Sequence, residues 1–347
     1  MIMAQTGSAT LDIEKVVSDV LKTIERERER EIVSRRFGLF DRKETLEQIG
    51  ELLGITRERV RQLEKAVVIR LRLMAEQKQL PHIQDLQALF KQHLIAMGNI
   101  ARIQDLTSKV TSENSRLNQS RVAFLAELCP ELAVIEDNDH FHHSVGIASV
   151  HNVKKIKDLV ASIIETIKEI GEPSEVKQIA EKAGQDDHKN TEALAGTSKQ
   201  LAMLNGHWGL IKWPLVNPKN IRDKIFVILK EQGKHMHFNE ISDAIKKSDF
   251  KRKDVTTQAI HNELIKDKRF VLIGRGIYAL KEWGYEKGTV ADIITEVLKK
   301  AGEPLHRDEI VKRVLKSRYV KETTILLNLQ GKQQFKRVAK ATYALAE

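Results

Sequence analysis

The sequence is poor in the residues that build disulfide-rich, zinc-binding or all-β proteins. Its 347 residues include one cysteine, Cys129, and six prolines, and aromatic residues make up 5%. A single thiol excludes an intrachain disulfide framework and a four-thiolate zinc site. No apolar run approaches the roughly 18 residues of a membrane span, and the N-terminus lacks the basic-then-apolar order of a signal peptide. We therefore expect a cytoplasmic, nucleoid-associated protein without a membrane partner.

The sequence also lacks the fingerprints of catalytic and cofactor sites. It has no Walker loop, no dinucleotide fingerprint and no Ser-His-Asp order, and the Gly-Arg-Gly at 274–276 fits a hairpin turn better than a phosphate loop. Asp139, His140, His142 and His143 could supply metal ligands. A short His-rich loop without a partner cysteine is usually solvated, however. We expect no enzyme, no catalytic residue, no cofactor and no metal, and we expect Cys129 to pack as a small apolar residue.

What the sequence does have is charge of both signs. Lys and Arg number 58 and Asp and Glu 48, which gives a net charge of +10, and 41% of the residues are apolar. This balance is typical of a folded chain, and the length predicts two to four domains. Because acidic residues are interleaved with the basic ones, any nucleic-acid surface must be a local patch.

A unit recurs four times from about residue 84 to the end. Each copy begins with an amphipathic helix that stops at a glycine; the four are Gly98, Gly171, Gly233 and Gly302. A second helix follows, and then a third, which carries the apolar pairs Phe124/Leu128, Leu201/Leu204, Ile260/Leu264 and Leu326/Leu329. Each copy closes with an apparent β-hairpin, at 132–143, 207–213, 269–280 and 335–345.

Three helices and a terminal hairpin are the plan of a winged helix-turn-helix. We therefore expect a mainly α fold: an N-terminal helix-turn-helix followed by three or four tandem winged helix-turn-helix units with small β-hairpin wings. The expected domains are 1–80, 81–150, 151–216, 217–285 and 286–347. The connectors are short and polar, so the units should behave as beads with limited mutual contact.

The third copy carries basic positions that have almost no counterpart in the second. Lys251, Arg252 and Lys253 precede its third helix and Arg275 lies at its hairpin tip, which suits phosphate or minor-groove contact. The segments H-M-H-F-N-E-I (235–241) and R-F-V-L-I-G-R-G-I-Y-A-L-K-E-W-G-Y (269–285) resemble the HARE-HTH family of winged helices. That family includes the N-terminal domain of the bacterial RNA polymerase delta subunit. The resemblance implies an accessory role around DNA or polymerase, but winged helices also serve as protein-contact modules.

Residues 45–73 read as a helix, a turn and a second helix. Thr45 and Gln48 form a capping box, Gly54 ends the first helix, and Thr56 caps the second. The apolar face of the first helix is Leu46, Ile49, Leu52 and Leu53, and that of the second is Val60, Leu63, Val67 and Leu71. In the preceding segment, the charged run 25–31 should form a solvated helix with i, i+3 ion pairs.

The outward face of the second helix suits the major groove of DNA. Its candidate DNA-binding residues are Thr56, Arg57, Glu58, Arg61, Gln62 and Lys65. Arg can contact guanine, Glu can accept from cytosine and Gln can pair with adenine, each worth about 1–3 kcal/mol of discrimination. The alternative is a solvated helix, in which Glu58 and Glu64 neutralise nearby arginines through i, i+3 pairs.

The segments R-E-I-V-S-R-R-F-G-L (30–39), T-L-E-Q-I-G (45–50) and G-I-T-R-E-R-V-R-Q-L-E-K-A (54–66) resemble region 4 of sigma-70 family factors. The resemblance implies −35 promoter recognition, base or backbone contacts for Arg57, Glu58, Arg61 and Gln62, and docking on the β flap of RNA polymerase. The helical regions that open promoters in sigma factors have no counterpart ahead of the match, so we do not expect promoter melting.

Two hypotheses follow from these residues. In the first, the chain is a non-enzymatic bacterial transcription regulator or sigma-like accessory that binds double-stranded DNA and RNA polymerase core. In the second, the same helices dock on polymerase and never read DNA.

Overall fold

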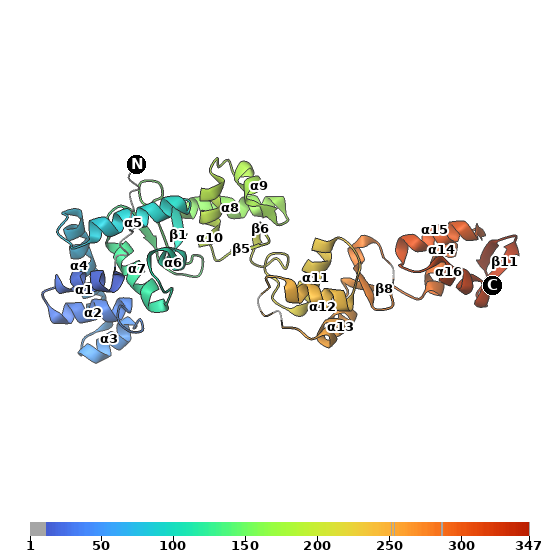
Figure 1. Cartoon of the computed structure of the whole chain (residues 1–347), viewed down its shortest axis with the longest axis horizontal. Coiled ribbons are helices and arrows are strands. Elements are labelled where there is room, and N and C mark those ends of the chain that lie inside the picture. Colours follow the sequence, from blue (N-terminus) through green and yellow to red (C-terminus); the bar gives the residue numbers. More distant parts are fainter. Residues whose placement is uncertain (1–11, 251, 253, 286, 347) are drawn as a thin grey trace, which may run out of the picture. The chain divides into compact units, whose positions relative to one another are not determined.

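Helices dominate the chain, as expected from its composition. The computed structural model describes residues 12–250, 252, 254–285 and 287–346, and strands in these residues are confined to four small antiparallel sheets (Figure 1). The chain divides into two compact units, one up to Lys212 and one from Trp213. None of the helices in the described ranges has the length and apolar character needed to cross a membrane.

Four helices precede the repeats: α1 (Ile13–Lys22), α2 (Glu27–Phe37), α3 (Leu46–Leu53) and α4 (Arg57–Glu76). Asp12 starts α1 by accepting hydrogen bonds from two backbone amides of the first turn. Gly38 and Gly54 end α2 and α3 in the left-handed conformation, each with a φ of 65°. These caps fix where each helix stops and so set the lengths of the connecting turns.

The long helix α4 belongs to two hydrophobic cores. Near its start, Val60 packs with Ile32 and Ile49 in a small core shared with α2 and α3. Further along, Val67 and Leu71 join a larger core that extends from α1 through the first repeat. The expected domain boundary between residues 80 and 81 falls inside this larger core. The helix-turn-helix is therefore attached to the first repeat by packing as well as by the chain.

The described repeats share one order of elements. The first has α5 (Ile83–Ala96), β1 (Ile100–Arg102), α6 (Ile103–Val110), α7 (Arg116–Leu128), β2 (Leu132–Ile135) and β3 (Ser144–Ile147). The second has α8 (Val153–Ile170), β4 (Ser174–Glu175), α9 (Val176–Lys182), α10 (His188–Thr197), β5 (Leu201–Leu204) and β6 (His207–Leu210). The third has α11 (Ile221–Gln232), β7 (Met236–His237), α12 (Phe238–Lys247), α13 (Thr257–Lys266), β8 (Phe270–Gly274), β9 (Ile277–Leu280) and the short 3-10 helix η1 (Lys281–Trp283). The fourth has α14 (Val290–Ala301), β10 (Leu305–His306), α15 (Arg307–Ser317), α16 (Glu322–Gly331), β11 (Phe335–Ala339) and β12 (Thr342–Leu345).

Each sheet has three strands rather than the two of the expected hairpin. The sheet orders are β1-β3-β2, β4-β6-β5, β7-β9-β8 and β10-β12-β11, so a short strand before the second helix always pairs with the last strand. In the third copy, for example, Tyr278 is opposite both Met236 and Leu272. The added strands have two or three residues, too few for an alternating pattern to show in the sequence.

The second repeat corrects one assignment. Leu201 and Leu204 were expected on the third helix, but they begin and end strand β5, and the third helix is α10. The cause is the turn Asn205-Gly206, in which both residues have positive φ, 49° and 78°. Such a two-residue turn closes a tight hairpin, and it places the preceding four residues in a strand paired with His207–Leu210.

The first two repeats are joined by hydrogen bonds, whereas the sequence predicts units with limited mutual contact. The amide of His142 donates to the carbonyl of Thr197 and that of Lys199 to the carbonyl of His140, both at 2.8 Å. Asn190 on α10 also donates to the carbonyl of Gly98 at 2.6 Å. The His-rich loop therefore joins the two copies through its backbone. In the described residues no group of three or more His, Cys, Asp or Glu side chains is placed to hold a metal ion.

Leu71 and Leu73, two residues apart on α4, provide a test of how this helix packs into the larger core. Leu71 is fully buried, whereas Leu73 is 51% exposed. We expect Leu71→Ala to lower the free energy of unfolding by about 2–5 kcal/mol, because it leaves a cavity in a packed core. Leu73→Ala should stay within about 0.5 kcal/mol. Urea denaturation followed by circular dichroism measures both, and equal losses would contradict the assignment.

Candidate nucleic-acid interface

The ends of the two helices in the helix-turn-helix are set by capping residues that can be recognised in the sequence. The hydroxyl of Thr45 accepts from the amide of Gln48 at 3.2 Å, and the Gln48 side chain accepts from the amide of Thr45 at 2.9 Å, which confirms the capping box. Thr56 caps α4 by accepting from the amide of Arg59 at 3.2 Å. A Cβ on Gly50 would lie 2.7 Å from the carbonyl oxygen of Ile55. Glycine at this position thus lets the turn pack directly on α3.

The candidate reading face of α4 is open to solvent. Thr56, Arg57, Glu58, Arg61, Gln62 and Lys65 are all exposed. The exposed fractions of the side chains are 68% for Arg57, 58% for Glu58 and 53% for Arg61. The opposite face buries Val60 and Val67 completely or nearly so. The helix therefore presents its polar groups outward from a fixed apolar base.

These polar groups are already joined to one another. Arg61 donates from Nε and Nη2 to the Glu58 carboxylate at 2.8 and 2.7 Å, and Gln62 donates to the same carboxylate at 3.2 Å. These hydrogen bonds, chiefly from Arg61, lower the pKa of Glu58 to about 2. Arg57 pairs with Glu47 on α3 at 2.8 Å. Lys65 has no ion-pair partner within the described part of the chain, so it is the free cation of the face.

The network also bears on the solvated-helix alternative. One of its two expected pairs, Glu58 with Arg61, is present, but Glu64 pairs instead with Arg36 of α2 at 3.3 Å. Ion pairs between exposed side chains contribute little in water, because solvent screens them. A base edge that offers two aligned hydrogen bonds can therefore replace such a partner. In the absence of DNA, ion pairs and hydrogen bonds thus orient the side chains of the candidate reading face, and these interactions can be exchanged for others.

Ion pairs between helices fix α4, and they cannot be recognised from the sequence, because the partners lie far apart along the chain. Glu29 on α2 accepts from Arg70 on α4 at 2.7 Å, and its side chain is only 8% exposed. The hydrogen bond from Arg70 lowers the pKa of Glu29 despite this burial. Arg28 donates to the carbonyl of Leu53, at the end of α3. The run 25–31 is therefore not simply a solvated helix, because Glu29 clamps α2 to α4.

One apolar assignment in this segment was also wrong. Leu52 was placed on the buried face of α3, but it is 55% exposed. Ile49 is fully buried, and Leu46 and Leu53 pack against it from the sides. An eight-residue helix offers about two turns, too few to bury every apolar residue along it.

The third repeat shows part of its expected basic site. Arg252 is exposed in the turn before α13, and Arg275 is exposed at the tip between β8 and β9. Lys251 and Lys253 lie outside the described residues. On α13 itself, the exposed side chains of Gln258 and Asn262 are uncharged and share a hydrogen bond of 3.1 Å. Arg252 and Arg275 thus lie beside the third helix, and the cation on the helix itself is Lys266 in its last turn.

The third helix of the first repeat, α7, is a packing element. Phe124 is fully buried against Phe37, with ring centroids 4.9 Å apart. The buried Arg121 donates to the carbonyl of Leu39 at 2.9 Å and pairs with Glu14 at 2.8 Å. Helix α7 thus packs against the N-terminal helices through these two residues.

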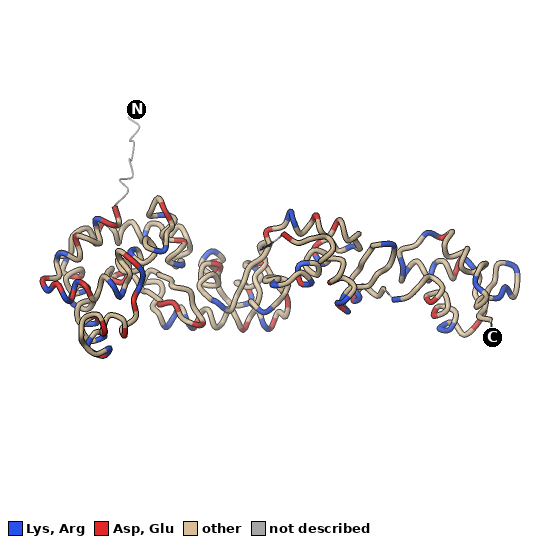
Figure 2. Tube along the Cα trace, turned by 90° about the horizontal axis from the view of Figure 1, so that it is seen from below, with Lys and Arg blue, Asp and Glu red and all other residues tan. Residues whose placement is uncertain are grey.

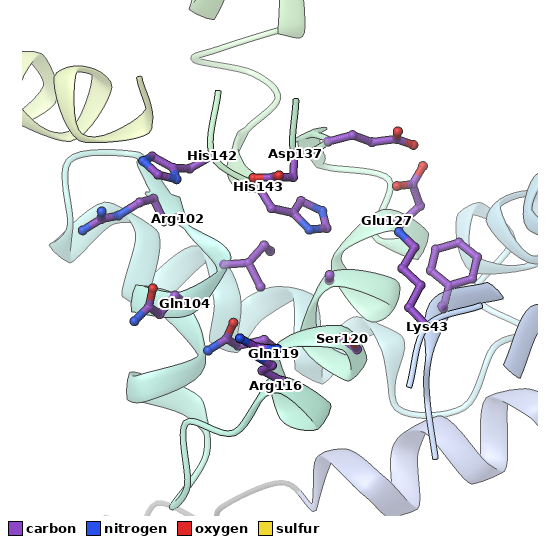
Figure 3. Close-up of a pocket in the computed structure, with 14 residues that line it drawn as sticks. Lys43, Arg102, Gln104, Arg116, Gln119, Ser120, Glu127, Asp137, His142 and His143 are labelled. Atoms are coloured by element: carbon purple, nitrogen blue, oxygen red, sulfur yellow. The ribbon is translucent and has the colours of Figure 1, made fainter. Parts of the chain in front are cut away.

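The rest of α7 lines a polar pocket of about 650 Å³ (Figure 3). Figure 3 shows Arg102, Gln104, Gln119 and Arg116 on one side, with Glu127 and Lys43 across from them. His142 and His143 close its rim, and burial lowers the pKa of both imidazoles. The pocket is electrically balanced: its cations are Lys43, Arg102 and Arg116, and its carboxylates are Glu127, Glu136 and Asp137. The lining of this pocket therefore carries no excess of cations.

The Glu58–Arg61 pair makes a prediction about pH. The depressed pKa means that the pair is complete above the ordinary glutamate value of 4.5 and is lost as the pH falls toward about 2. We expect a carboxyl-detected NMR titration of Glu58 to have its midpoint near 2, and to move back toward 4.5 in Arg61→Ala. An unchanged midpoint in that variant would show that Arg61 is not the cause. Glu51→Ala, on the neighbouring helix, is the control.

A family comparison agrees with this geometry. Residues 26–73 match the family model of sigma-70, region 4. The match covers α2, α3 and most of α4, which are the helices that share the small core and carry the outward polar face. Region 4 of sigma-70 is a DNA-binding helix-turn-helix domain that takes part in −35 promoter recognition and in contact with RNA polymerase, and residues 26–73 of this chain are similar to it.

Proposed function

We propose that the chain is a bacterial DNA-binding transcription regulator or sigma-like initiation accessory. It reads promoter-like DNA of the −35 type through α4 and contacts RNA polymerase. The observation that carries the proposal is the open face of α4, where Arg57, Glu58 and Arg61 are each more than half exposed on a helix anchored in two cores. The family match at 26–73 supports it.

The reading step follows from the order of side chains along α4. Helix-turn-helix proteins place the N-terminal turns of the second helix against base edges. There, Arg57 and Arg61 exchange their carboxylate partners for guanine, and Glu58 accepts from cytosine. Gln62, one turn beyond Glu58, is suited to adenine. Lys65, the free cation, contacts phosphate and adds affinity without sequence preference.

The repeats supply further contacts in this proposal. We take each as a winged helix-turn-helix and keep the expected divisions near residues 150, 216 and 285. Arg252 and Arg275 of the third copy, with Lys251 and Lys253, contact DNA phosphates beside its third helix. The chain acts without catalysis, cofactor or metal, and in the cytoplasm at the nucleoid.

Contact with polymerase is the second part of the proposal. Region 4 domains contact RNA polymerase, and we propose the β flap as the site. The alternative is that α2–α4 dock on polymerase without reading DNA. The observation that favours this alternative is that Glu58 and Arg61 already satisfy each other in the free protein.

Base readout can be tested by comparing Glu58 and Lys65, two exposed residues that lie about two turns apart on the same face of α4. We expect Glu58→Ala to change which bases are preferred in a systematic-selection experiment, because it removes an acceptor for cytosine. Lys65→Ala should weaken all sequences about equally and lower the salt slope of binding by about one. Glu51→Ala, an exposed glutamate on α3, should change neither. Uniform losses from both Glu58→Ala and Lys65→Ala would contradict readout.

The alternative has its own test. We expect replacement of Arg57, Glu58, Arg61 and Gln62 by Ala to abolish the promoter footprint of the full chain, because these residues supply the base contacts. If purified polymerase still captures this variant, and the unaltered chain leaves no footprint with or without polymerase, docking without readout is the better account.

A further inference from the structure

The hairpins of the four repeats share a backbone plan but differ in charge. The first, 132–147, carries Glu136, Asp137 and Asp139 and neither Lys nor Arg. The second, 201–210, has no Asp, Glu, Lys or Arg, and the third, 270–280, has only Arg275. The fourth, 335–345, carries Lys336, Arg337 and Lys340 and no acidic residue. Charge thus rises along the chain from three negative to three positive.

The three cations of the fourth hairpin have no acidic partner in the described part of the chain. All three are exposed, and the one side-chain hydrogen bond found for them among the described residues runs from Arg337 Nε to the carbonyl of Ala339 at 3.2 Å. Two arginines elsewhere in the same repeat do have acidic partners: Arg307 pairs with Asp308 and Arg313 with Glu309. In Figure 2 this hairpin, near the C-terminal end, shows blue and tan segments, whereas the helices show both red and blue.

The hairpin is held firmly at its base and projects at its tip. Phe335 and Tyr343, 7% and 8% exposed, anchor it in the core of the fourth repeat. The turn after Lys340 places Ala341 at a φ of 54°, which reverses the chain tightly. Between the cations, Val338 is 46% exposed. An apolar side chain flanked by cations on a projecting ribbon matches the minor groove and its two phosphate rims.

We propose that the hairpin at 335–345 binds the phosphate backbone of duplex DNA without sequence preference. This proposal rests on the proposed function only in taking DNA as the ligand, because the hairpin contains none of the residues of α4. The acidic first hairpin is repelled by the same polyanion, and the uncharged second hairpin gains nothing from it. The fourth hairpin thus adds affinity and α4 adds selectivity.

The test uses the full chain and a random-sequence duplex without a −35 element. We expect Lys336→Gln, Arg337→Gln and Lys340→Gln together to lower the slope of log K against log salt by about 2–3, since each phosphate contact contributes about 0.9. The control removes the same charge from the second repeat, through Lys154→Gln, Lys157→Gln and Lys177→Gln, all exposed. It should lower the slope by less than about one. Equal slopes for the two triple variants would overturn the proposal.

A second set of variants distinguishes DNA binding by the hairpin from DNA binding by α4. With Arg57, Glu58, Arg61 and Gln62 changed to Ala, the hairpin substitutions should still lower the slope for random duplex by about 2–3. If readout by α4 fails its own test, this result stands. Loss of the hairpin effect in that background would overturn the proposal. So would an unchanged DNA slope together with lost binding to phosphatidylserine vesicles, which would assign the hairpin to a membrane surface.

Discussion

The candidate reading face depends on the anchoring of α4 in two hydrophobic cores. Its first half closes a small core with α2 and α3, and its second half is part of the core that includes the first repeat. The small core has only Ile32, Ile49 and Val60 fully buried, which is little for independent stability. The ion pairs of Glu29 with Arg70 and of Arg36 with Glu64 join α2 to α4 and so help to fix the orientation of the two helices. Without the larger core, the outward side chains would have no fixed base from which to read a groove.

The same packing fixes the place of the first repeat in its unit. Its third helix, α7, packs against the N-terminal segment through Phe124 and Arg121. Its hairpin loop joins the second repeat through the backbone of His140 and His142. The first repeat therefore works as a platform: one side holds the helix-turn-helix, and the other side holds the next repeat.

Sequence reasoning succeeded where the rules are local and failed where partners are distant along the chain. The capping box at Thr45, the stop at Gly54 and the apolar spacing of α4 are decided within a few residues, and all are present. Glu29 looked like one more solvated acid because its partner Arg70 is on another helix. The packing of α7 against the N-terminal helices is equally long-range. The turn at Asn205-Gly206 differs from these cases, because its two residues are adjacent and are themselves a hairpin-turn signal.

The charge along the hairpins divides the work among the repeats. Once the strands are bounded, the same structural part is acidic in the first copy and basic in the fourth. The acidic copy is also the one whose third helix packs against the N-terminal helices. The basic copy keeps its hairpin cations unpaired among the described residues. A repeated fold can thus serve as both platform and anchor, because packing and surface charge change while the backbone plan does not.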